Sequence, residues 1–193
     1  LKMPQCVVIK KKILEKKRRT TRKHLVDFNR RRTLLIKSEN QDIKEKSLRD
    51  IGQLSKRELM LVGAALYWGE GYRIEIQKRT PQVSFSNSDP RMVVLFMSFL
   101  KEVMQVPEER IRPRIQIFGN ILPKDSVEFW SKTLSLPPER FYVFSAFNKA
   151  SKGKRSKNFL PFGTIQINVN DRRQAFKMKG WINGLAQQTR IKN

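Results

Sequence analysis

Short segments in which apolar and polar residues alternate place the strongest constraint on how this chain can fold. Four such segments occur, at residues 73–77, 82–86, 112–117 and 164–169. Because successive side chains of a strand point to opposite faces, the alternation predicts strands with one apolar and one polar face. Residues 140–147 are a candidate fifth strand with an ambiguous period. The alternation therefore predicts a sheet whose apolar face is covered by other elements of the chain.

Helix signals fall between the predicted strands. Ser55 and Glu58 have the spacing of a capping box, ahead of an apolar segment at 59–68 with no polar stripe. A helix of that kind is expected to be buried on every side. Further start signals are Asp89 followed by Pro90, Asp125 with Glu128, and Asn170 or Asp171. The order of elements predicts an α+β fold, with an antiparallel sheet of four or five strands and helices on one face.

The N-terminal part differs in composition from the rest. Residues 1–57 hold 19 Lys and Arg against 6 Asp and Glu, a net charge of +13. We interpret residues 1–54 as a basic, largely helical arm and residues 55–193 as a folded domain. The arm either contacts phosphates directly or is a solvated helix or tail.

The formal net charge of the whole chain is +24, which favours a polyanionic partner. One cysteine, Cys6, excludes a disulfide framework, and one histidine, His24, excludes Cys2His2 fingers and sites built on histidine pairs. The longest apolar run is half of what a bilayer span needs. We therefore expect an intracellular nucleic-acid-binding protein with no membrane partner, cytoplasmic and associated with the nucleoid.

The polar faces of the four predicted strands share an unusual composition, rich in arginine and glutamine. Such side chains can form bidentate hydrogen bonds with guanine or adenine in the major groove of duplex DNA. The alternative is a polar sheet face without a partner. The twelve positions are Arg73, Glu75, Gln77, Gln82, Ser84, Ser86, Arg112, Arg114, Gln116, Thr164, Gln166 and Asn168.

Residues 148–158 form a basic loop between two predicted strands. Lys152, Lys154 and Arg155 are candidates for phosphate contacts in this loop. The loop could equally be solvated in the free protein.

Glu70 lies at the carboxyl end of the predicted apolar helix, where the helix dipole disfavours a carboxylate. The small residues Gly63, Ala64 and Ala65 would let a second helix approach closely. If two such helices pack together, two carboxylates meet, and a divalent cation between them would offset their repulsion. Oxygen ligands of this kind favour Mg²⁺. Such a metal next to a phosphate can activate water.

The nine residues 63–71, Gly-Ala-Ala-Leu-Tyr-Trp-Gly-Glu-Gly, resemble a diverged LAGLIDADG motif, the signature of that homing-endonuclease family. The resemblance covers roughly residues 55–190 and rests on this motif and on the order of elements. It implies a saddle-shaped sheet over double-stranded DNA and a homodimer joined by paired motif helices, with Gly63, Ala64, Ala65 and Leu66 at the interface. It also implies that Glu70 is the catalytic, metal-binding acid and that the Gly69 carbonyl is a further ligand.

Three functions follow, in order of preference. The first is a Mg²⁺-dependent, site-specific DNA endonuclease acting as a homodimer. The second is a non-cleaving regulator of transcription on the same fold. The third is a maturase-like protein that binds RNA.

Overall fold

A computed structural model describes residues 5–71, 81–117, 121–145 and 160–188. The chain divides into two compact units, Leu1–Gln53 and Leu54–Asn193, here called the N-terminal unit and the C-terminal unit. Each is described by itself.

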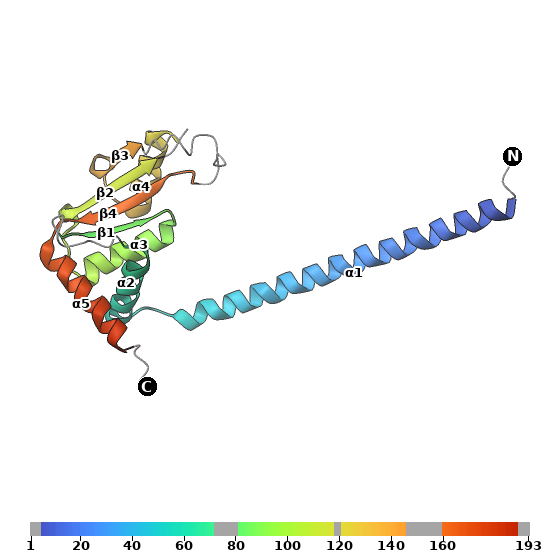
Figure 1. Ribbon diagram of the computed structural model, residues 1–193, viewed down its shortest axis with the longest axis horizontal. Coiled ribbons are helices and arrows are strands. Elements are labelled where there is room, and N and C mark those ends of the chain that lie inside the picture. Colours follow the sequence, from blue (N-terminus) through green and yellow to red (C-terminus); the bar gives the residue numbers. More distant parts are fainter. Residues whose placement is uncertain (1–4, 72–80, 118–120, 146–159, 189–193) are drawn as a thin grey trace. The chain divides into compact units, whose positions relative to one another are not determined.

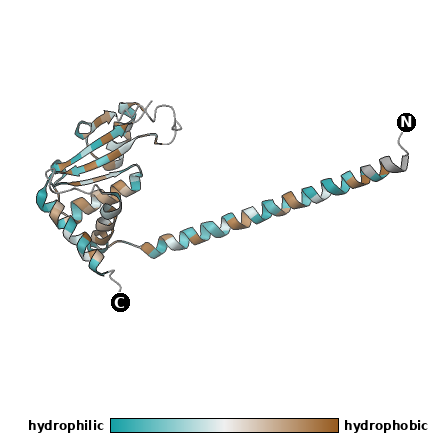
Figure 2. Ribbon diagram, in the orientation of Figure 1, coloured by the Kyte–Doolittle hydropathy of each residue, from teal (hydrophilic) through white to brown (hydrophobic). Residues whose placement is uncertain are grey.

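Within the described residues of the N-terminal unit lies one helix, α1 (Gln5–Ile51), of 47 residues (Figure 1). At 1.5 Å per residue, a helix of this size is about 70 Å long. Figure 2 shows hydrophilic residues along most of α1, with hydrophobic ones scattered among them. Its large apolar side chains are exposed, with Phe28 at 62% and Leu35 at 72%. The helix is therefore held mainly by its own backbone hydrogen bonds and local side-chain contacts.

The C-terminal unit is α+β, as predicted. Its α-helices are α2 (Lys56–Glu70), α3 (Pro90–Ser98), α4 (Pro123–Leu134) and α5 (Arg172–Gln188). Its strands are β1 (Val83–Asn87), β2 (Ile111–Ile117), β3 (Tyr142–Ser145) and β4 (Thr164–Val169). A π-helical turn, η1 (Phe99–Val103), continues α3, and two 3-10 turns, η2 (Glu108–Arg110) and η3 (Pro138–Arg140), precede β2 and β3.

The four strands form one sheet in the order β1-β4-β2-β3. Strand β4 pairs antiparallel with β1 and with β2, whereas β2 and β3 are parallel. The predicted all-antiparallel sheet is thus wrong, and the sheet is mixed. The physical reason is the connection between β2 and β3, which contains α4, because a parallel pair needs a crossover of this kind rather than a hairpin. The strand predicted at 73–77 lies outside the described residues.

Helices cover the apolar face of the sheet. Phe85, Ile115, Ile165 and Ile167 have no exposed surface on this face. Helices α2, α3 and α5 contact β1, and α4 contacts β2 (Figure 1). Trp130 of α4 donates a hydrogen bond from its indole N–H to the Phe162 carbonyl at 3.0 Å, which ties α4 to the segment before β4.

The helix start signals account for three of four starts, and one of the three is Asp171, whose carboxylate accepts hydrogen bonds from the Arg173 and Gln174 amides at 2.8 and 3.3 Å at the start of α5. The Ser55 capping box is formed, because the Glu58 carboxylate accepts from the Ser55 amide at 2.7 Å and the Ser55 hydroxyl accepts from the Glu58 amide. Asp89 caps α3, and Pro90 occupies its first turn. The predicted cap at Asp125 is wrong: α4 begins at Pro123, because proline already has the helical φ that the first turn requires.

Candidate nucleic-acid interface

The polar face of the sheet points away from the helices and is organised in rows across the strands. In one row, Ser86, Gln166, Arg114 and Tyr142 are register partners on all four strands. At about 4.8 Å between strands, this row spans roughly 14 Å, whereas a B-DNA major groove is about 12 Å wide and admits two neighbouring strands. The row presents a hydroxyl, an amide, a guanidinium and a phenol across the four strands.

Two further rows flank it. Ser84, Asn168 and Arg112 form one, and Thr164, Gln116 and Phe144 form the other. Arg112 and Arg114 are exposed, and Gln82, Ser86, Gln116, Thr164 and Gln166 are half-buried.

Ser84 and Asn168, in contrast, are buried, with exposed fractions of 1% and 6%. The Ser84 hydroxyl accepts a hydrogen bond from the Gln166 amide nitrogen at 3.0 Å. The Asn168 amide nitrogen lies 3.4 Å from the Arg112 carbonyl. Both side chains therefore form hydrogen bonds within the sheet. The part of the polar face that is open to a ligand is centred on β2 and β3.

Two aromatic residues of this face were not predicted. Tyr142 is 60% exposed and Phe144 is half-buried, and their rings stack with centroids 6.3 Å apart. The Arg114 guanidinium carbon lies 5.2 Å from the Tyr142 centroid and 4.9 Å from that of Phe144. The alternation of Tyr142, Val143 and Phe144 was the available signal, but so short a segment did not indicate which residues point outward.

The carboxyl end of α2 adjoins the edge of the sheet. Gly71 ends the helix by donating its amide to the Tyr67 carbonyl at 2.8 Å, and it forms an antiparallel bridge with Phe85 of β1. Burial raises the pKa of the Tyr67 hydroxyl, against the smaller opposing effect of a hydrogen bond with the Ser84 backbone. Gly69 and Glu70 are exposed, so the candidate acid lies in solvent, one residue from the bridge to β1.

The small residues of α2 have different environments. Gly63 and Ala64 are buried within the C-terminal unit, and a Cβ on Gly63 would overlap the ring of Phe99. Leu66 is half-buried against the core, and Ala65 is exposed. The space beside Gly63 is thus filled by this chain's own η1, not left for a second helix.

The prediction that this helix is buried on every side is wrong for a single copy of the chain. Leu61 and Trp68 are 36% and 41% exposed, and with Ala65 they form an apolar stripe that we call the α2 outer face. The helix packs against α3, α5, η1 and β1, and these neighbours cover only its other side. An apolar surface of this kind remains available for a partner.

The oxygen atoms at the end of α2 are of the chemical type that a hard cation prefers. The last carbonyls of a helix lack intrahelical partners, and the Gly69 carbonyl belongs to this group, beside the Glu70 carboxylate. Hard cations such as Mg²⁺ prefer such oxygen ligands. Across the part of the chain that the structure describes, no three His, Cys, Asp or Glu side chains gather in a metal-binding group.

Six predicted site residues lie outside the described residues. They are Arg73, Glu75, Gln77, Lys152, Lys154 and Arg155.

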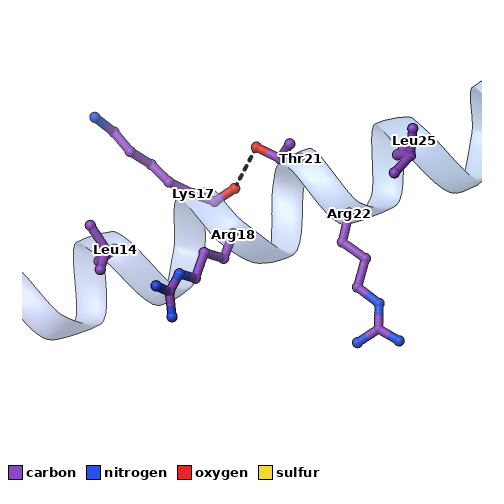
Figure 3. A pocket seen from close by; sticks show the side chains of 6 residues that line it. All are labelled: Leu14, Lys17, Arg18, Thr21, Arg22 and Leu25. Carbon is purple, nitrogen blue, oxygen red and sulfur yellow. Dashed lines mark hydrogen bonds between the residues drawn. The ribbon is translucent and has the colours of Figure 1, made fainter.

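The charge of α1 is concentrated in its first half. Residues 10–32 hold twelve Lys and Arg against two acidic residues, a net charge of +10, whereas residues 33–51 hold four of each. Figure 3 shows a shallow depression in the basic half, lined by three basic side chains between two leucines, with Thr21 donating its hydroxyl to the Lys17 carbonyl at 3.0 Å. All six lining residues are exposed: Leu14, Lys17, Arg18, Thr21, Arg22 and Leu25. The basic half is thus a second surface suited to phosphates.

In the described ranges, no helix combines the length and the apolar character that a membrane span requires. No family model matches the chain, and no curated protein and no solved structure is significantly similar to it.

Proposed function

We propose that the C-terminal unit binds duplex DNA through the polar face of its sheet, in the manner of a LAGLIDADG protein. The observation that carries this proposal is the row of Ser86, Gln166, Arg114 and Tyr142, which crosses all four strands. Two neighbouring strands of the row fit a major groove, and the guanidinium and amide groups suit the edges of guanine and adenine. The net charge of +24 supplies the attraction to phosphates.

The proposal includes a homodimer. Two copies would join through the α2 outer face, where Ala65 lets the helices approach and Leu61 and Trp68 supply apolar area. This arrangement differs from the predicted interface, because Gly63 and Ala64 are occupied within each copy. Since Glu70 ends the same helix, pairing the helices would bring two carboxylates together over the DNA.

The proposed reaction is hydrolysis of a phosphodiester bond in each strand at a defined site. Glu70 and the Gly69 carbonyl of each copy would hold Mg²⁺ next to the scissile phosphate. A bound Mg²⁺ would polarise the phosphate and lower the pKa of a coordinated water. The sheet would fix the DNA so that this phosphate lies between the two acids.

The test compares Glu70→Gln with a matched variant, Glu128→Gln, which removes an exposed carboxylate from α4. Each protein is incubated with Mg²⁺ and a library of randomised duplexes, and cut ends are sequenced. Wild type and Glu128→Gln should cut at one shared site, whereas Glu70→Gln should bind that site without cutting. If Glu70→Gln and wild type cut alike, Glu70 is not the catalytic acid.

One observation favours a second function, that of a regulator which binds DNA without cutting it. Among the described residues, Glu70 belongs to no cluster of metal-binding side chains. In this case wild type should bind one duplex sequence in a salt-dependent manner with no need for Mg²⁺, and no cut ends should appear. A preference for structured RNA over duplex DNA at equal salt would support instead the maturase-like function predicted third.

A further inference from the structure

The parallel pairing of β2 and β3 places an arginine beside two aromatic rings on the polar face. Arg114 and Tyr142 are register partners, as are Gln116 and Phe144. The Arg114 guanidinium lies over both rings, at 5.2 Å and 4.9 Å from their centroids. Among the described residues, these two rings provide the contacts that hold the Arg114 guanidinium in place.

Stacking on a ring face restrains the plane of a guanidinium but leaves its N–H donors at the edge of that plane. A hydrogen bond or an ion pair within the protein would instead occupy some of those donors. The arginine is thus partly ordered before it meets a ligand and loses less conformational freedom on binding. Guanine presents two acceptors, O6 and N7, in the major groove, and the fork of an arginine matches both.

We propose that Arg114 reads one guanine of the DNA site, and that Tyr142 and Phe144 are positioning residues that hold its guanidinium in the reading orientation. The proposal rests on the function proposed above and adds to it the base that is recognised and the residues that prepare the contact. Strand β3 acquires a role in specificity although its side chains carry no charge.

Arg112 provides a comparison on the same strand. It is exposed and lies on the same face two residues earlier, where its register partner is Asn168. No aromatic ring of the described residues stacks on it. Its guanidinium therefore keeps more freedom and suits a phosphate, a contact that adds affinity without reading a base.

The experiment measures affinity for the preferred duplex and for duplexes in which each guanine of the site is replaced in turn. The variants are Arg114→Ala, Arg112→Ala, Tyr142→Phe, and the double variant Tyr142→Leu with Phe144→Leu. The control is Phe176→Leu, which removes a ring that is 44% exposed on α5. The thermal midpoint of each protein is recorded, so that loss of folding is separated from loss of reading.

Wild type should prefer guanine at one position by about 5- to 150-fold, the range of a bidentate contact. Arg114→Ala should abolish that preference, and the double leucine variant should lower it about tenfold while its binding to unrelated duplexes stays unchanged. Tyr142→Phe, which keeps the ring, should keep the preference for guanine, and the Phe176→Leu control should behave as wild type. Arg112→Ala should weaken binding to all duplexes equally.

Two outcomes would overturn the inference. If the double leucine variant keeps the full preference while Arg114→Ala loses it, the rings do not position the arginine. If wild type binds a single strand more tightly than its duplex, and loss of the rings removes this binding, the aromatic pair stacks unpaired bases instead. Failure of the proposed function looks different, because wild type would then prefer no duplex sequence.

Discussion

Replacing Gly63 by alanine tests how α2 is seated in the core. The new Cβ would overlap the Phe99 ring, whose Cε2 atom would lie at 2.7 Å. Phe99 is fully buried and packs against the rings of Phe96 and Trp181, so it has little room to yield. Overpacking of this kind lowers the free energy of unfolding by about 1–3 kcal/mol. The better helix propensity of alanine raises it by up to about 1 kcal/mol.

A second glycine of the same helix isolates the packing cost. A Cβ on Gly69 would meet nothing within 4 Å, so Gly69→Ala changes helix propensity without overpacking. The difference in unfolding free energy between the two variants is therefore the cost at Phe99, about 1–3 kcal/mol. For a unit of this size, it corresponds to a difference of roughly 3–10 °C in Tm.

The assay is urea unfolding followed by circular dichroism, with Tm measured at several protein concentrations. Gly63→Ala should be the less stable variant at every concentration. Adding Phe99→Leu to it should recover part of the loss, because the smaller side chain leaves room for the Cβ. Equal stability of Gly63→Ala and Gly69→Ala would refute the packing argument. If Gly63→Ala loses stability only at high protein concentration, Gly63 lies in a dimer interface instead.

Three further predictions concern a helix cap, pH and salt. Ser55→Ala should lower the stability of the C-terminal unit by about 1 kcal/mol, measured by urea unfolding, because α2 loses the capping box. Hydrogen bonds from Arg91 hold the pKa of Asp89 at about 2, below its ordinary value of 3.8. The stability that this carboxylate contributes should therefore be complete above pH 3.8 and be lost as the pH falls toward 2, and acid titrations of Asp89→Asn should lack that loss. Replacing the basic residues of 10–32 by glutamine should flatten the dependence of log Kd on log salt concentration by about 0.9 for each phosphate that the helix no longer neutralises, and an unchanged slope would place α1 away from the DNA.

The faces of β1, β2 and β4 were predictable from sequence, because a period of two assigns every residue of such a strand to one side. Arg112, Arg114 and Gln116 alternate with buried residues of β2 as predicted. Exposure within that face was not predictable, because it depends on where a strand lies in the sheet. Ser84 and Asn168 have the same pattern as the arginines and are nevertheless buried.

The pairing of the strands could not be predicted from the sequence pattern either. Nothing in the composition of β3 distinguishes a parallel neighbour of β2 from an antiparallel one, and the decisive element is the helix that joins them. For this reason the contact between Arg114 and the rings of Tyr142 and Phe144 emerges only in three dimensions.

Small residues gave a similarly incomplete indication. Gly63 correctly predicted that another group approaches α2 closely, but the sequence does not identify that group. The group is Phe99, which lies 36 positions further along the chain. A stripe of small residues predicts that something packs closely and leaves open whether the neighbour is a second molecule.

The place of β4 in the sheet has a consequence for how the protein is made. Strands β1 and β2 do not pair with each other, and both pair with β4, which is the last of the four described strands along the chain. Until Thr164–Val169 has been synthesised, neither strand has its central neighbour, and the sheet cannot assemble stepwise from its N-terminal end. A chain cut short before β4 would expose two unsatisfied strand edges, so proteolysis or aggregation should remove such products, whereas a chain that contains β4 can pair all four strands.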